Sequence, residues 1–158
     1  MKISTSYFYQ IRYFSKNMIP VSTAIWDPQW FHTGNNTGEY QDKNGVWNGI
    51  RMPILSPIKL DANICAQCSH HDPSDCAFQK NYREYLKSLD FDKIYQSLER
   101  LATTIVALEN LSDEPHIVLI VHEKPNNPCS ERKALQEFFT SHGIPCRELE
   151  YPIKKEEE

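Results

Sequence analysis

The sequence has few glycines, no long apolar run and no excess of positive charge. It contains five glycines among 158 residues and no glycine-rich phosphate-binding loop. No apolar run approaches the roughly 18 residues that a membrane helix needs, so we expect no contact with a membrane. The amino terminus lacks an apolar segment followed by a cleavage site, which predicts a cytoplasmic protein without an export signal. With 17 basic and 21 acidic residues, the chain lacks the broad basic surface of proteins that hold nucleic acid by phosphate attraction.

Length and composition indicate one globular domain. The chain is close to the commonest domain size, and its 40% apolar and 24% charged residues are typical of a folded protein. We expect a single α/β domain over residues 1–153. The charged residues 154–158 are expected to form a disordered tail.

Short runs of β-branched or apolar residues predict strands at 2–6, 19–26, 115–122 and 144–150. The run PHIVLIVH at 115–122 is almost continuously apolar, which favours a central strand buried on both faces. Residues 27–62 hold four of the five glycines and no sustained periodicity, so they are expected to form a long connection. Its aromatic side chains predict packing against the body of the domain.

Three helices are expected among these strands. The first begins with Asp72 as cap and Pro73 in the first turn, and extends through FQKNYREYLKSL. The second covers about 91–109, and the third covers about 130–142 and ends at Gly143. Apolar residues of the second helix repeat at steps of four and three, which predicts one buried stripe: Ile94, Leu98, Leu101, Ile105 and Leu108. The alternation of strands and helices predicts a mostly parallel sheet flanked by helices.

The five cysteines are Cys65, Cys68, Cys76, Cys129 and Cys146. A reducing compartment makes a disulfide framework unlikely to form, so another role is expected. Cys65 and Cys68 form a C-x2-C turn, the geometry of zinc knuckles, and Cys76 follows in the first turn of a predicted helix. The positive end of that helix favours the thiolate, which is the form that binds metal. The sequence therefore predicts a long irregular metal-binding loop, with ordinary reduced cysteines as the alternative.

The fourth ligand and the metal stay open at this point. Cys129 is slightly favoured as the fourth ligand, and the adjacent His70 and His71 are the alternatives. Zinc is the expected cofactor, although four cysteines would equally suit an iron–sulfur cluster. Cys146 lies in a predicted strand and is expected to be buried in the core.

A candidate ligand site follows the predicted central strand. Ligands of parallel α/β sheets bind at the carboxyl ends of strands, where helix amino termini also point. Ser130 is a good helix cap, and Lys124 and Arg132 supply positive charge for an anion. Ser6 and Tyr7 end a strand that is expected to run parallel to the central one. We therefore expect these five residues to bind a small anionic or nucleotide ligand.

Four segments resemble domain-of-unknown-function family 488. They are TSYF near the start, IPVSTAIWDPQW, the C-x2-C segment leading to YREYLKSLDF, and HEKPNNPCSER. The resemblance spans about residues 3–150, and it implies a small α/β domain with no established activity. The commoner form of the family has His-Arg directly after the loop cysteine. This chain has Ser130-Glu131-Arg132 there, so no histidine is present at that position to perform its role.

Two functional hypotheses follow. The first is a metal-containing binding or regulatory domain that recognises a nucleotide or nucleic-acid ligand, in which flat aromatic side chains stack on bases. The alternative is an enzyme acting on a phosphate-bearing substrate, with Cys129 as nucleophile and Arg132 holding the anion. The two compete for one sulfur, because a cysteine in a closed metal site is not a free nucleophile. We expect His122 to be a hydrogen-bonded residue at a strand end rather than a base.

Overall fold

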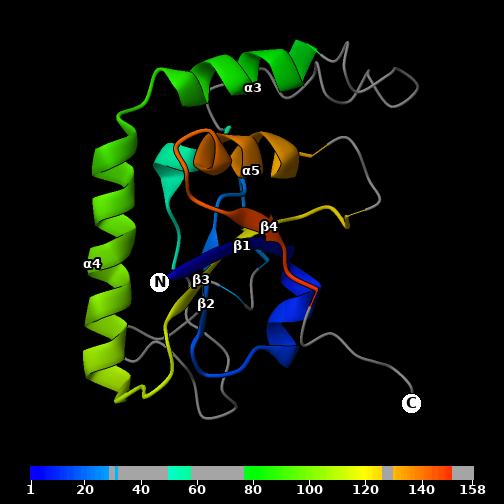
Figure 1. The fold of residues 1–158 in the computed structure, drawn as a ribbon. Coiled ribbons are helices and arrows are strands. Elements are labelled where there is room, and N and C mark those ends of the chain that lie inside the picture. Colours follow the sequence, from blue (N-terminus) through cyan, green and yellow to red (C-terminus); the bar gives the residue numbers. More distant parts are fainter. Residues whose placement is uncertain (29–30, 32–49, 58–76, 126–129, 151–158) are drawn as a thin grey trace.

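The computed structural model describes residues 1–28, 31, 50–57, 77–125 and 130–150. They include a four-stranded sheet in the order β2-β3-β1-β4, in which every neighbouring pair is parallel. Helices pack against it (Figure 1), so the predicted α/β class is confirmed. The segments 58–76 and 126–129, which hold four of the cysteines, and the expected tail at 154–158 lie outside the described residues.

The strands are β1 (Lys2–Tyr7), β2 (Met18–Ser22), β3 (His116–Val121) and β4 (Cys146–Glu148). All six residues of β3 are buried, as its apolar run predicts for a central strand. β2 ends at Ser22, earlier than predicted. The Ser22 hydroxyl bonds locally to the backbone N–H of Ala24 at 3.2 Å and to the Asp27 carboxylate, which favours a turn over further pairing.

Three helices lie on one side of the sheet (Figure 1): α3 (Ala77–Lys87), α4 (Phe91–Glu109) and α5 (Arg132–Thr140). The bounds of α4 match the prediction, and its residues Ile94, Leu98 and Ile105 are buried. Leu108 was expected in the same stripe but is 58% exposed. This position falls in the last turn of α4, one residue before the helix ends at Glu109, where the described residues leave the stripe exposed. None of the helices in the described ranges is both long and apolar enough to cross a membrane.

Both ends of α4 and the end of α5 have clear local causes. The Asp90 side chain accepts a hydrogen bond from Lys93 N at 3.3 Å at the start of α4. Asn110 ends that helix in the left-handed conformation, with φ 53°. Gly143 follows α5 with φ +84°, and Ile144 N donates to Phe139 O at 3.0 Å, so the predicted end of the helix is confirmed.

The other face of the sheet carries a second apolar cluster. Its members include Phe8 and Ile11 of the 3-10 helix η1 (Phe8–Tyr13), together with Phe31, Val118 and Ile120. A second short 3-10 helix, η2 (Pro53–Leu55), buries Leu55 completely against the helical side. In the described part of the long connection, Phe31 and Leu55 are fully buried, which agrees with the expected packing.

Candidate functional site at the carboxyl edge of the sheet

The parallel strands bring their carboxyl ends to one edge of the sheet. Tyr7 ends β1, Ser22 ends β2 and Val121 ends β3, so the residues after them lie together at this edge. Glu148 at the end of β4 pairs with Thr5 of β1. Ligand sites of parallel α/β sheets form at such edges.

Arg132 is held at this edge by three hydrogen bonds. Its Nε donates to Glu148 Oε1 at 2.5 Å, and its Nη2 donates to the backbone oxygen of Glu123 at 2.7 Å. Its backbone N–H donates to Ser130 Oγ at 3.1 Å, just before the cap residue Glu131 of α5. The side chain is only 6% exposed. Arg132 Nη1 is buried and has no hydrogen-bond partner among the described residues.

Glu148 connects Arg132 to the sheet. Its Oε1 also accepts from Thr5 Oγ1 at 2.8 Å, and Thr5 Oγ1 in turn accepts from Gln136 Nε2 at 2.7 Å. Burial raises the pKa of Glu148, and the positive charge of Arg132 opposes that shift. Glu148 Oε2 and Glu123 Oε1 are buried without partners within the described ranges. The cluster around Arg132 therefore retains unused donors and acceptors, which a polar ligand could satisfy.

The buried carboxyl of Glu131 near this edge has a strongly raised pKa. Its side chain lies between Ser130 and Arg132 in sequence and is 7% exposed. Burial raises the pKa of Glu131 to about 8, and the nearby charge of Glu123 adds to that shift. The carboxyl group is therefore mostly protonated at neutral pH and can donate a proton.

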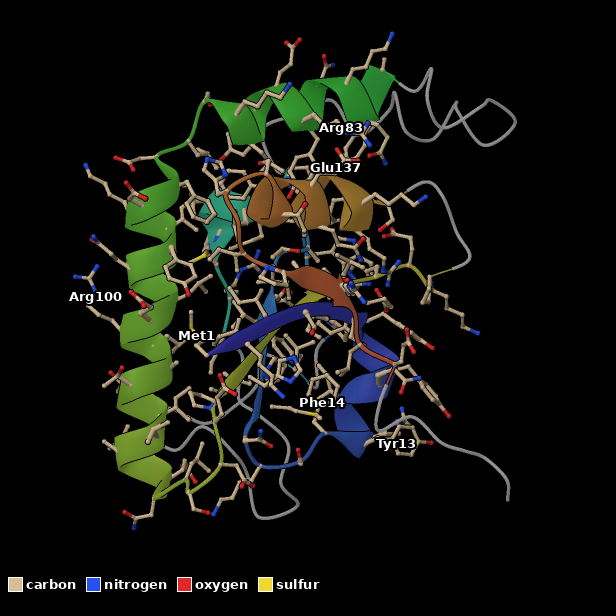
Figure 2. The ribbon with its side chains drawn as sticks, in the orientation of Figure 1. Met1, Tyr13, Phe14, Arg83, Arg100 and Glu137 are labelled. Atoms are coloured by element: carbon tan, nitrogen blue, oxygen red, sulfur yellow. The ribbon has the colours of Figure 1, made fainter. Side chains whose placement is uncertain are left out.

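Helix α3 is tied to the start of α5. Gln79 Nε2 donates to the backbone oxygen of Ser130 at 2.5 Å, and Gln79 is 3% exposed. An ion pair between Arg83 Nε and Glu137 Oε1, at 2.7 Å, joins the same two helices (Figure 2). These contacts bring the residues that follow Cys76 and Cys129 in the chain close together.

The end of β2 forms a separate polar network. Asp27 is completely buried at its side chain and accepts from Ser22 Oγ and from Arg51 Nη1, the latter at 2.7 Å. Arg51 Nη2 donates to Ala24 O at 2.9 Å. Both Asp27 oxygens are thus paired within the protein, so this network anchors the chain after β2 rather than offering free groups to a ligand.

An exposed aromatic side chain lies beside the end of β3. His122 Nε2 bonds to the backbone oxygen of Trp26 at 2.6 Å. The centroids of the His122 and Trp26 rings are 4.1 Å apart. The His122 ring also contacts Phe8, at 4.8 Å. Trp26 remains 63% exposed. His122 is therefore the hydrogen-bonded strand-end residue that was expected, and it holds a flat indole at the carboxyl edge.

The structure unites only part of the predicted ligand site. Ser130 and Arg132 are in contact, and Lys124 is exposed in the loop after β3. Ser6 lies on the opposite face of β1 from Thr5, because side chains alternate along a strand. Its hydroxyl is buried without a partner in the described part of the chain. The Tyr7 hydroxyl accepts from Gln10 Nε2 at 2.9 Å, which ties it to η1 and not to Arg132.

The predicted metal ligands Cys65, Cys68, Cys76 and Cys129, with the alternatives His70 and His71, lie outside the described residues. Within the described ranges no three His, Cys, Asp or Glu side chains form a group suited to a metal. Cys146 is buried at 3% exposure, as predicted. Burial raises its pKa to about 12.

Sequence reasoning did not assign a role to the three glutamates of the site, which are Glu123, Glu131 and Glu148. Glu148 follows Cys146 by two residues, so alternation directs both side chains to the same buried face. Glu131 stands between two residues with more obvious roles, and its sequence position alone does not mark it as buried. Comparison with known proteins adds nothing to these observations, since no family model, curated protein or solved structure matches the chain.

Proposed function

We propose that the chain is an α/β binding or regulatory domain that recognises a phosphate-bearing, nucleotide-like ligand at the carboxyl edge of its sheet. The observation that carries this proposal is Arg132 Nη1, a buried donor without an acceptor among the described residues. A buried donor left unpaired costs about 1–3 kcal/mol, and an oxygen of a bound phosphate would remove that cost. Glu148 and the Glu123 carbonyl hold the guanidinium in place, so the donor is already oriented. Because Nη1 is buried, a ligand reaches it once the atoms that cover it move aside.

Trp26 supports a ligand with a flat ring as well as an anion. Its indole is 63% exposed, and stacking of a base on an aromatic ring contributes about 1–3 kcal/mol. Trp26 follows β2, and Arg132 bonds to β4 at the other side of the sheet. The outer strands of a four-stranded sheet lie about 14 Å apart, so a nucleotide with an extended phosphate chain suits this edge better than a small inorganic anion.

Calorimetric titration with adenosine triphosphate, adenosine monophosphate and adenosine tests this function. We expect the triphosphate to bind and the nucleoside to bind at least about tenfold more weakly. Arg132→Lys keeps the charge beside Glu148 but loses the Nη1 donor, so it should weaken binding about tenfold. Trp26→Ala should do the same, whereas Tyr13→Ala removes an aromatic ring that is 41% exposed on η1 and should have no effect. Equal affinities in all four proteins would contradict the proposal.

We also propose a zinc site made of Cys65, Cys68, Cys76 and Cys129, with an iron–sulfur cluster as the alternative. The bond from Gln79 to Ser130 supports this set. Gln79 follows Cys76 by three residues and Ser130 follows Cys129 by one, so the chain can bring these two sulfurs near each other. A thiolate site of this kind is consistent with the expected reducing cytoplasm. The parallel α/β sheet is likewise consistent with membership of domain-of-unknown-function family 488.

Elemental analysis of the purified protein tests the metal site. We expect about one zinc per chain, lost in Cys68→Ser together with much of the thermal stability, because metal binding is coupled to folding. Cys146→Ser is the matched control, since Cys146 is buried in the core, and its metal content should equal that of the wild type. The same metal content in Cys68→Ser would contradict the proposed ligands.

A Cys-dependent enzyme is the second candidate, and Glu131 is the observation that favours it. A carboxyl with a pKa of about 8 can serve as a general acid at neutral pH. It would act beside Arg132 as the anion-binding group and Cys129 as the nucleophile. Rapid alkylation of Cys129 in a metal-free protein would support this candidate. One equivalent of metal together with an unreactive Cys129 would exclude it.

A further inference from the structure

A pocket of about 400 Å³ opens at the amino edge of the sheet, opposite the site described above. Its lining comes from the first residues of β1 and β3, from the segment around the start of β4, and from α4. Met1 marks its position at the start of β1, on the side near α4 (Figure 2). The volume falls in the range of small-molecule sites, roughly 300–1,000 Å³. We call it the amino-edge pocket.

Two exposed cations line this pocket. Lys2 begins β1, and Arg147 of β4 pairs with Ser4. Strand alternation puts Lys2 and Ser4 on the face of β1 turned away from the helices, and the register puts Arg147 on that face too. The pocket extends from this face around the amino edge to Tyr95 on the helical side. One strand spacing and two residues separate Lys2 from Arg147, on the order of 8 Å between their Cα atoms. Both side chains are long enough to reach a shared anion. Neither forms an ion pair within the described ranges.

Neutral hydrogen-bonding groups lie beside the cations on β1 and β3. Ser4 Oγ and His116 Nε2 are 2.7 Å apart. Burial lowers the pKa of His116, and the charge of Lys2 adds to that shift, so the imidazole is mostly neutral at physiological pH. The nearby carboxylate of Glu114 is bonded to the Met1 ammonium at 2.8 Å. That bond lowers the pKa of Glu114. The charge of Glu114 is therefore already matched, and the charges of Lys2 and Arg147 remain available.

Part of the wall is apolar. Tyr95 of α4 lines the pocket together with Ile144 and Pro145, which precede β4. The Tyr95 ring stacks on Phe91 with centroids 5.9 Å apart, which fixes its orientation. Two cations beside an aromatic and aliphatic wall suit a molecule with a doubly charged group on an organic body.

We propose that the amino-edge pocket binds a small organic dianion, such as a phosphomonoester, held by Lys2 and Arg147. Its organic part contacts Tyr95, Ile144 and Pro145. This site is separate from the nucleotide site at the carboxyl edge and does not depend on it. Charge-assisted hydrogen bonds of this kind typically contribute a factor of about ten or more in affinity each.

Calorimetric titration with phenyl phosphate, at low ionic strength and without an amino-terminal tag, tests the proposal. We expect a dissociation constant below the millimolar range, weakened about tenfold by Lys2→Gln and by Arg147→Gln. Arg100→Gln is the matched control, because this substitution removes the same charge from an exposed position. Arg100 lies on the outer side of α4 (Figure 2). Benzyl alcohol should not bind. Succinate binding that is also lost in Arg147→Gln would support the site and identify a dicarboxylate as its ligand.

Proton NMR signals of the His116 ring provide a second readout in the wild-type protein, and we expect them to shift during the titration. Three results would overturn the proposal. The first is no heat and no shift with phenyl phosphate or succinate at millimolar concentration. The second is binding that Lys2→Gln and Arg147→Gln leave unchanged. The third is binding lost in Arg132→Lys but kept in Arg147→Gln, which would assign the ligand to the carboxyl edge.

Discussion

Replacing Glu131 with Gln should change how stability depends on pH. The pKa of Glu131 is about 8 in the folded protein, against about 4.3 for a free glutamate. Between these values the unfolded chain loses its proton while the folded protein keeps it. Stability therefore falls as pH rises through this window, by about 1.4 kcal/mol per pH unit. Below the window both states are protonated, and the group has no effect.

Glutamine resembles the protonated carboxyl but does not titrate. Relative to wild type, Glu131→Gln should gain roughly 3 kcal/mol of unfolding free energy between pH 5.5 and pH 7.5. Urea denaturation followed by circular dichroism measures this difference, and the raised pKa of Glu148 cancels because both proteins contain it. Glu137→Gln is the control, since its side chain is 57% exposed in a surface ion pair. Curves for Glu131→Gln and wild type that run parallel across this range would refute the reasoning.

Three further predictions concern the core and its boundaries. Leu98→Ala should lower the free energy of unfolding by about 2–5 kcal/mol, because Leu98 is fully buried. Leu108 is exposed, so Leu108→Ala should change that free energy by less than about 1 kcal/mol. Urea denaturation of the two variants measures the difference. Gly143→Ala should lower the free energy of unfolding by about 1–2 kcal/mol through backbone conformation alone. The φ of Gly143 is +84°, and an added Cβ would meet no atom within 4 Å. A loss of unfolding free energy near zero would contradict this prediction. Cys146 should resist iodoacetamide in the native protein at neutral pH, because its pKa is about 12 and its side chain is buried. Mass spectrometry that finds rapid labelling of Cys146 would show that the core opens readily.

Local patterns predicted the elements whose cause is local. The apolar run at 115–122 became the buried β3, and the periodic stripe at 91–109 became α4 with matching bounds. The end of β2 was missed because the Ser22 hydroxyl bonds to Asp27, and Asp27 is held in turn by Arg51, which lies 29 residues beyond Ser22 in the chain. The exposure of Leu108 was missed for a related reason. Helical periodicity gives the buried face of a helix, but it does not show how far along the helix that face stays covered.

The same distinction applies to the candidate site. Ser130 and Arg132 follow from the rule that ligands bind at strand carboxyl ends, and the structure brings them into contact. Glu148 depends on the pairing of β4 with β1, which joins residues 143 positions apart. Ser6 was expected beside Arg132, but strand alternation places it on the other face of β1. Local alternation gives the face on which a side chain lies, but the pairing of distant strands decides which polar groups on that face converge.

A crystal structure with bound adenosine triphosphate tests the central claim most directly. We expect a phosphate oxygen within hydrogen-bond distance of Arg132 Nη1 and the adenine ring stacked on Trp26. Arg132 should keep its bonds to Glu148 and to the Glu123 carbonyl. An Nη1 atom paired with a protein oxygen, together with nucleotide bound elsewhere or not at all, would contradict the account.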